Sequence, residues 1–169
     1  SSSLGVEHQL LPGLGATFMW YHREWRNLHR TDNDLVTFAD YSPVEIVSPL
    51  DGSVITAYNL NPAKRGLVQQ VDRNATDTST RRNSYNAFEL GLNGRLPGGG
   101  NAFGGWTADR TVDVVCDSRD DPNTLRFCDQ SKLGMPFQHE FKLSVTQPLP
   151  GRFQAGVTLT SWAGGLNGN

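Results

Sequence analysis

Three short turns of proline and glycine, each between two β-like segments, constrain the fold of this chain most strongly. They are Leu11-Pro12-Gly13-Leu14-Gly15, Leu96-Pro97-Gly98-Gly99-Gly100 and Pro148-Leu149-Pro150-Gly151. Proline sets φ near the value that a turn requires, and glycine adopts positive φ without a steric cost. Two strands joined by such a turn form a hairpin. The chain is therefore predicted to contain three antiparallel hairpins.

The segments beside these turns alternate apolar and polar residues, as a two-faced strand does. Phe88, Leu90 and Leu92 fall on one face, and Glu89 and Asn93 fall on the other. The expected strands are residues 4–11, 16–28, 87–96, 101–115, 140–146 and 153–160. The predicted fold class is all-β, with about six main strands in up-and-down hairpins. The alternation fits a barrel wall with a polar interior and also a two-sheet sandwich with its apolar faces inward.

The connections between the hairpins are long and polar, covering residues 29–82 and 116–137. Short turns at one side and long loops at the other are typical of outer-membrane β-barrels. Within the first connection we expect short strands at 44–47, 53–60 and 67–71, and a solvated, mobile stretch at 72–82. We interpret residues 1–169 as a single β-barrel segment.

Composition and the first residues bear on the binding partners and on membrane insertion. The formal net charge of −2 gives no basic footprint for nucleic acid. No apolar run approaches the ~20 residues of a transmembrane helix. The chain opens with Ser1-Ser2-Ser3-Leu4, without a Met or a basic leader, so we expect a cut or processed end.

Two cysteines, Cys116 and Cys128, flank a polar loop. An oxidising periplasm or cell exterior favours a disulfide between them, whereas a reducing cytosol would leave free thiols. The loop is acidic, and its oxygen-bearing side chains form a candidate Ca²⁺ site. The candidate ligands are Asp117, Asp120, Asp121, Asn123 and Asp129. Their spacing is not that of an EF-hand, and the other interpretation is a solvated outer loop.

Histidines near carboxylates give an alternative function. His22, His139 and Glu140 are the candidate catalytic residues, because a histidine can act as a general base toward water. The sequence has neither a G-x-S-x-G nucleophile motif nor H-E-x-x-H. This alternative is a small hydrolase that opens lactones or esters with a metal- or His-activated water. Otherwise these residues are ordinary strand and rim positions.

Several motifs, in order along the chain, together resemble one family. They are Gly5-Val6-Glu7-His8-Gln9-Leu10-Leu11-Pro12-Gly13, Tyr58-Asn59-Leu60-Asn61-Pro62-Ala63-Lys64, Tyr85-Asn86-Ala87-Phe88-Glu89, Arg95-Leu96-Pro97-Gly98-Gly99-Gly100, Gly104-Gly105-Trp106-Thr107, Phe127-Cys128-Asp129-Gln130 and Pro136-Phe137-Gln138-His139-Glu140-Phe141-Lys142-Leu143. Nearly the whole chain is similar to the late barrel region of Oar-like TonB-dependent receptors of Acidobacteria. Those receptors combine a carboxypeptidase-regulatory-like domain, a plug and a large outer-membrane barrel.

The resemblance implies a location in the bacterial outer membrane and a role in uptake or surface binding. A 22-stranded transporter barrel at ~10 residues per strand needs about 220 residues in strands alone, so we expect a fragment of such a barrel or a small protein derived from one. In the parent protein its partner would be membrane lipid or detergent, with no nucleic acid and no cofactor beyond the candidate Ca²⁺. A soluble chain would have to close a small barrel or form a homo-oligomer, because its apolar faces need cover.

Overall fold

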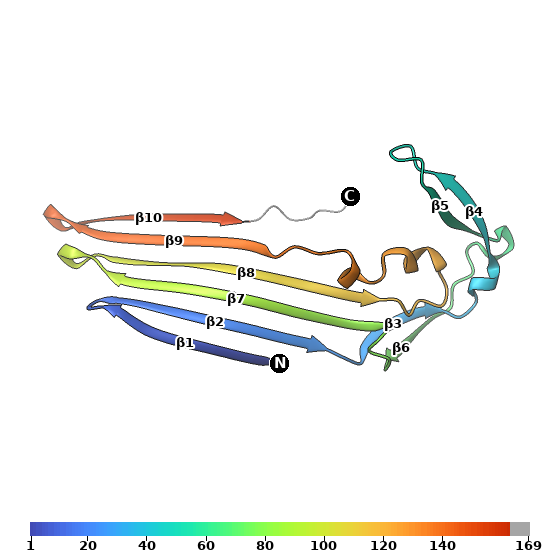
Figure 1. The fold of residues 1–169 in the computed structure, drawn as a ribbon, viewed down its shortest axis with the longest axis horizontal. Coiled ribbons are helices and arrows are strands. Elements are labelled where there is room, and N and C mark those ends of the chain that lie inside the picture. The colour runs from blue at the N-terminus through green and yellow to red at the C-terminus, as the bar shows by residue number, and fades with distance from the viewer. Residues whose placement is uncertain (163–169) are drawn as a thin grey trace. The chain divides into compact units, whose positions relative to one another are not determined.

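The structure, a computed structural model, describes residues 1–162 and confirms the all-β, antiparallel fold class. Its largest sheet has six strands in the order β1-β2-β7-β8-β9-β10 (Figure 1). The bounds, in that order, are Ser2–Leu11, Leu14–Trp25, Arg81–Arg95, Asn101–Val115, Gln138–Leu149 and Phe153–Trp162. Each strand pairs with the strand that follows it among these six, which is the expected up-and-down arrangement.

The three proline–glycine turns lie together at one end of this sheet (Figure 1). Each contains a glycine in the left-handed region, with φ of 84° at Gly13, 81° at Gly98 and 80° at Gly151. The second and third turns are short 3-10 helices, η3 (Pro97–Gly99) and η6 (Pro150–Arg152). The turn chemistry read from the sequence therefore sets the three hairpins.

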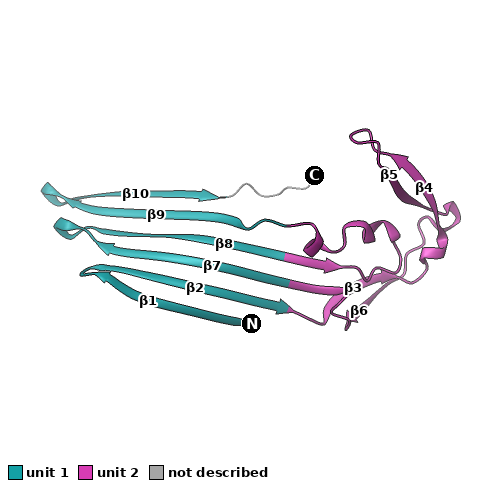
Figure 2. Cartoon of the chain, viewed as in Figure 1, with its two compact units in different colours: residues 1–24, 84–111, 135–169 teal, residues 25–83, 112–134 magenta. Residues whose placement is uncertain are grey.

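The chain divides into two compact units (Figure 2). The first comprises residues 1–24, 84–111 and 135–169, and the second residues 25–83 and 112–134. The second unit contains two small antiparallel sheets, each of two strands. One pairs β3 (Leu28–Asn33) with β6 (Gln70–Ala75), and the other pairs β4 (Tyr41–Val47) with β5 (Val54–Leu60). Its 3-10 helices are η1 (Phe38–Asp40), η2 (Pro62–Lys64), η4 (Pro122–Phe127) and η5 (Gln130–Lys132).

The long connection was predicted only in part. The strands expected at 44–47 and 53–60 correspond to β4 and β5, but the strand expected at 67–71 lies at Gln70–Ala75. The expected second strand, 16–28, ends at Trp25, and β3 begins at Leu28. The stretch 72–82 is not one solvated loop, because it contains most of β6 and the start of β7. These strands are rich in charge, and cross-strand ion pairs stabilise them where apolar alternation is missing.

Buried apolar side chains are few. Within the described residues the first unit buries only Ala87 and Ala108 in this class, whereas the second buries Val36, Ala75, Val112 and Val114. The large sheet is not a closed barrel, and every residue of its outer strands, β1 and β10, is exposed. The alternative of a small closed barrel is therefore not what the structure shows. A sheet with so little core needs apolar surroundings or a partner for at least one face.

Candidate functional site

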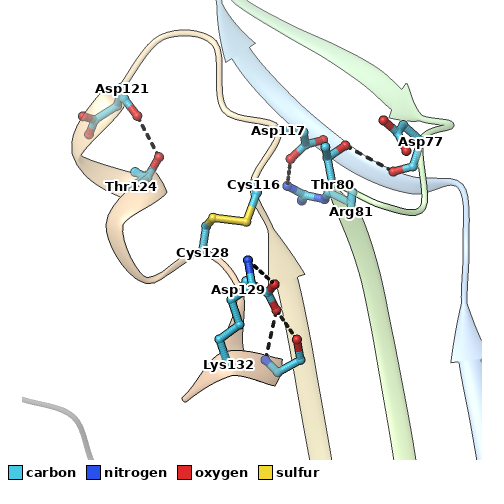
Figure 3. The surroundings of a disulfide bond; sticks show 11 residues. Asp77, Thr80, Arg81, Cys116, Asp117, Asp121, Thr124, Cys128, Asp129 and Lys132 are labelled. Carbon is cyan, nitrogen blue, oxygen red and sulfur yellow. Dashed lines mark hydrogen bonds and ion pairs between the residues drawn. A yellow bond between two sulfur atoms is a disulfide. The ribbon is translucent and has the colours of Figure 1, made fainter. Parts of the chain in front are cut away.

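The disulfide loop organises the second unit (Figure 3). Cys116 and Cys128 form the predicted disulfide, with their Cα atoms 4.9 Å apart. Two backbone hydrogen bonds frame the bond: the Cys116 amide donates to the carbonyl of Thr80, and the Val115 amide donates to the carbonyl of Cys128, both at 2.7 Å. The start of the loop, at Cys116, is thus joined to the residue that precedes β7, and its end, at Cys128, is joined to β8.

Asp117, a predicted Ca²⁺ ligand, is instead neutralised by two arginines. One carboxylate oxygen lies 3.1 Å from Nη1 of Arg81, and the other lies 3.5 Å from Nη1 of Arg30. Arg30 also donates to the backbone carbonyl of Asp117 at 3.3 Å. Only 6% of the Asp117 side chain is exposed, so its charge requires this pairing. Figure 3 shows the Arg81 side chain reaching Asp117 beside the disulfide.

Asp32, on the β3–β6 sheet, extends this network of arginine–aspartate ion pairs. Its Oδ2 atom accepts from Nε of Arg30 at 2.9 Å and from Nη1 of Arg73 at 3.1 Å, and the residue is buried. Arg73 binds Asp34 as well, at 2.7 Å. The hydrogen bond to Asp34, and then that to Asp32, raises the pKa of Arg73 above its ordinary value. This network was not predicted from the sequence, although Arg30 and Asp32 stand two residues apart in Leu28–Asn33, a spacing that puts both side chains on one face of a strand.

The other candidate Ca²⁺ ligands each serve a separate local contact. The three carboxylates cap or anchor backbone amides, at Asn33 for Asp120 (2.8 Å), Asn123 for Asp121 (2.9 Å) and Ser131 for Asp129 (3.1 Å). Hydrogen bonding from the Ser131 side chain, the largest cause, lowers the pKa of Asp129. Asn123 exchanges two hydrogen bonds with the backbone of Tyr58 on β5, at 2.8 and 3.0 Å.

Metal binding at this loop stays a prediction. Among the described residues, no group of three or more His, Cys, Asp or Glu side chains is placed to hold a metal ion. The contacts above give these side chains a structural use: Asp117 and Asp120 hold the loop against β3, Asn123 holds it against β5, and Asp121 and Asp129 cap the short helices η4 and η5.

The candidate catalytic residues lie on the large sheet and do not form one group. His22 is on β2 and His139 is on β9, with β7 and β8 between these strands. Nδ1 of His22 lies 2.8 Å from Oδ1 of Asn86, and the His139 ring stacks on Trp106 at 5.6 Å between centroids. Glu140 pairs with Lys142 at 2.7 Å. The geometry therefore gives the hydrolase alternative no assembled base and nucleophile.

The large sheet itself presents one apolar face. Residues paired directly across antiparallel strands project to the same side, so the register identifies each face. The pairs on the apolar face include Leu4 with Trp20, Val6 with Phe18, Trp106 with Phe141, Leu143 with Leu159 and Val145 with Val157. Of these, Leu4 is 72% exposed and Val157 71% exposed. A hollow of about 500 Å³ on this sheet has Leu90, Leu92, Trp106, Phe141 and Leu143 among its lining residues.

The opposite face is mainly polar, although it also carries Phe103, which pairs with Ser144, and Trp162, which pairs with Glu140. Its pairs include Glu7 with Thr17, Lys142 with Thr160 and Ser144 with Thr158. Tyr21 donates a hydrogen bond to Glu89 at 3.3 Å, and the Ser144 and Thr158 hydroxyls lie 3.1 Å apart. The six strands thus form a wall that separates an apolar surface from a hydrogen-bonding surface.

Comparisons of the chain with protein-family models, with curated proteins and with solved structures found no match. Within residues 1–162, none of the helical segments has the length and apolarity needed to span a bilayer.

Proposed function

We propose that this chain forms part of the wall and the outer loops of an outer-membrane β-barrel of the TonB-dependent receptor type, which takes up or binds a ligand at the cell surface. The observation that carries the proposal is the exposed apolar face of the six-stranded sheet, backed by a polar face. Lipid-facing and lumen-facing residues alternate in this way in a transmembrane barrel. In water the same face would be a large aggregation-prone patch.

The length of the apolar stripe matches a bilayer. On β9 the apolar-facing positions run from His139 to Leu149, ten residue steps. At ~3.3 Å per residue this is about 33 Å along the strand. A tilt of about 40° reduces it to about 25 Å along the membrane normal, the height of the apolar band in such barrels.

Aromatic side chains lie across the apolar face of the large sheet, on several of its strands. Phe18 stacks with Phe88 at 6.3 Å, and Phe88 meets Phe137 at 5.9 Å. Trp106 lies in the same region through its pairing with Phe141. Aliphatic residues such as Leu143 and Val145 follow toward the turns. Exposed aromatic and aliphatic side chains together on one face are typical of the lipid-facing surface of such a barrel.

The second unit supports the assignment of outer loops. Its residues supply the long connections from β2 to β7 and from β8 to β9, whereas the tight turns join the two strands within each hairpin. A disulfide and buried ion pairs stabilise it, and disulfides persist in oxidising compartments outside the cytoplasm. The two outer strands, β1 and β10, would pair with neighbouring strands of the same wall, since an exposed strand edge is a template for further pairing.

Depth-dependent fluorescence quenching tests the proposal. Trp106 and Trp162 lie at nearly the same height but on opposite faces, because Trp106 pairs with Phe141 and Trp162 pairs with Glu140. Two variants of the full chain would each retain one of these tryptophans, the other three being replaced by phenylalanine. After reconstitution into brominated phosphatidylcholine vesicles, Trp106 should lose at least half of its emission and Trp162 much less. Equal quenching of both residues, or quenching of neither, would refute the wall assignment.

A further inference from the structure

The second unit contains a polar pocket of about 380 Å³ that the contacts described above do not explain. It lies between Arg30 on β3, the end of β6 with the residues that follow it, and the first residues of the disulfide loop. The lining side chains that matter here are Asn74, Thr76, Asp77, Thr80, Ser118 and Arg119. Its volume is at the small end of the range of ligand sites, about 300–1,000 Å³.

The floor of the pocket is rigid. Arg30 and Asp117 are paired with each other, and Asp117 is also held by Arg81. Cys116, the residue before Asp117, is tied to Cys128. Asp77 closes its own turn, because its Oδ1 atom accepts from the amide and the hydroxyl of Ser79 at 2.9 and 2.7 Å. A site with walls fixed in this way loses little entropy when a ligand binds.

Several lining groups remain available for a ligand. The Arg119 side chain is exposed and has no hydrogen bond or ion pair to any residue in the described part of the chain; it acts on Asp34 through longer-range electrostatics. Asn74 and Thr76 likewise keep their side-chain donors and acceptors free within residues 1–162. Asp77 uses Oδ1 for its turn, which leaves Oδ2 as an acceptor.

We infer that this pocket binds a small hydroxylated carboxylate, of the chemical class of the sugar acids, with its carboxylate at Arg119 and its hydroxyls at Asp77, Thr76 and Asn74. A planar guanidinium matches a carboxylate with two parallel hydrogen bonds. A carboxylate oxygen, an amide and a hydroxyl are the groups that bind ligand hydroxyls. The inference rests on the proposed function, in which this unit faces the exterior, and it names the ligand class.

The lining favours this class over a zwitterionic amino acid. Hydroxyl and amide side chains surround the single free carboxylate oxygen, and Ala75 is the only apolar residue of the lining. A ligand with several hydroxyls can bind all of these groups, whereas an ammonium ligand can bind only the acceptors among them. Each additional hydrogen bond between ligand and lining adds a modest share of affinity, because the exposed lining groups otherwise bind water.

Calorimetric titration of the full chain, in detergent micelles, tests the site with four probes: D-glucuronate, D-glucose, acetate and glycine. Glucuronate should bind saturably and at least tenfold more tightly than each of the others. Arg119→Gln should weaken glucuronate at least tenfold, because it removes a charge-assisted pair. Asp77→Asn should weaken it severalfold while preserving the turn. Arg126→Gln, which changes another exposed arginine of the same loop, should leave the affinity unchanged.

Each other result overturns a defined part of the inference. Absence of saturable glucuronate binding removes the site. Equal affinity for glucose removes the role of Arg119, equal affinity for acetate removes the hydroxyl contacts, and tighter binding of glycine reassigns the pocket to zwitterions. Unchanged hydrogen exchange of the second unit shows that the variants fold. Lipid quenching of Trp106 is measured separately, so failure of the pocket and failure of the membrane proposal are distinguishable.

Discussion

Loss of the Cys116–Cys128 disulfide should loosen the second unit while leaving the hairpins of the large sheet intact. The two cysteines are 12 residues apart in the sequence, so the bond closes a short loop in the unfolded chain. In the chain-entropy treatment a loop of this size contributes about 3 kcal/mol to the folded state. That free energy corresponds to a change of about 100-fold in the equilibrium for opening.

Hydrogen exchange can read this change at two amides that depend on the loop. The Asn33 amide donates to Asp120, and the Tyr58 amide donates to Asn123, each at 2.8 Å. In the double variant Cys116→Ser, Cys128→Ser, protection at both amides should fall by about 100-fold under conditions where exchange reports the opening equilibrium. The amide of Leu143, on β9 of the large sheet, is the internal control and should not change.

The same measurement can refute the reasoning. If the Asp117 ion pairs and not the cross-link hold the loop, protection at Asn33 and Tyr58 should change by less than about threefold after the cysteines are removed. A parallel loss of protection at Leu143 would show that the two units open together, which contradicts the division of the chain. Chemical reduction of the wild-type protein should reproduce the effect of the double variant.

Three further predictions concern the charge network, the glycines of the large sheet and the titration of Asp40. Asp32→Asn should lower the free energy of unfolding of the second unit by about 2 kcal/mol, measured by urea titration, because Arg30 and Arg73 each lose one of their two carboxylate partners, the buried Asp32 side chain. Asp72→Asn, an exposed position on the same small sheet, should cost much less. Gly98→Val should cost about 1–2 kcal/mol in a detergent unfolding assay, because residue 98 has φ of 81°, whereas Gly156→Ala should be nearly neutral. Asp40 should titrate below the ~3.9 of an unfolded aspartate, because the backbone amide of Thr37 donates to it and lowers its pKa. Its contribution is complete above the unfolded pKa and is lost as the pH falls through the folded one, and an NMR titration with a folded midpoint at or above 3.9 would contradict this assignment.

The local sequence was enough to predict those elements that depend on residues close together in the chain. The turns at Gly13, Gly98 and Gly151 follow from proline and glycine chemistry, and the strand predicted at 101–115 has the bounds Asn101–Val115 in the structure. The disulfide also followed, since it needs only two cysteines and an oxidising compartment. Apolar alternation of period two was enough to place the main hairpins.

The missed elements depend on partners that are distant in the sequence. β3 and β6 pair with more than thirty residues between them, and their charged side chains give no apolar period. Asp32 gains its burial from Arg30 and from Arg73 on the partner strand. The candidate ligands Asp117 and Asp120 looked like a metal cluster in sequence, but the fold directs them to arginines and to a backbone amide.

The sequence by itself determined the hairpins, their turns, the disulfide and the two-faced character of the strands, because each depends on neighbours along the chain. Only the tertiary structure decided that β2 lies beside β7, that the sheet stays open with its apolar face exposed, and that the acidic loop is bound to β3 and β5. These features depend on free energies of pairing between segments far apart in the chain, which no local pattern records. The proline–glycine turns specify three hairpins, and the strand order joins them into one wall.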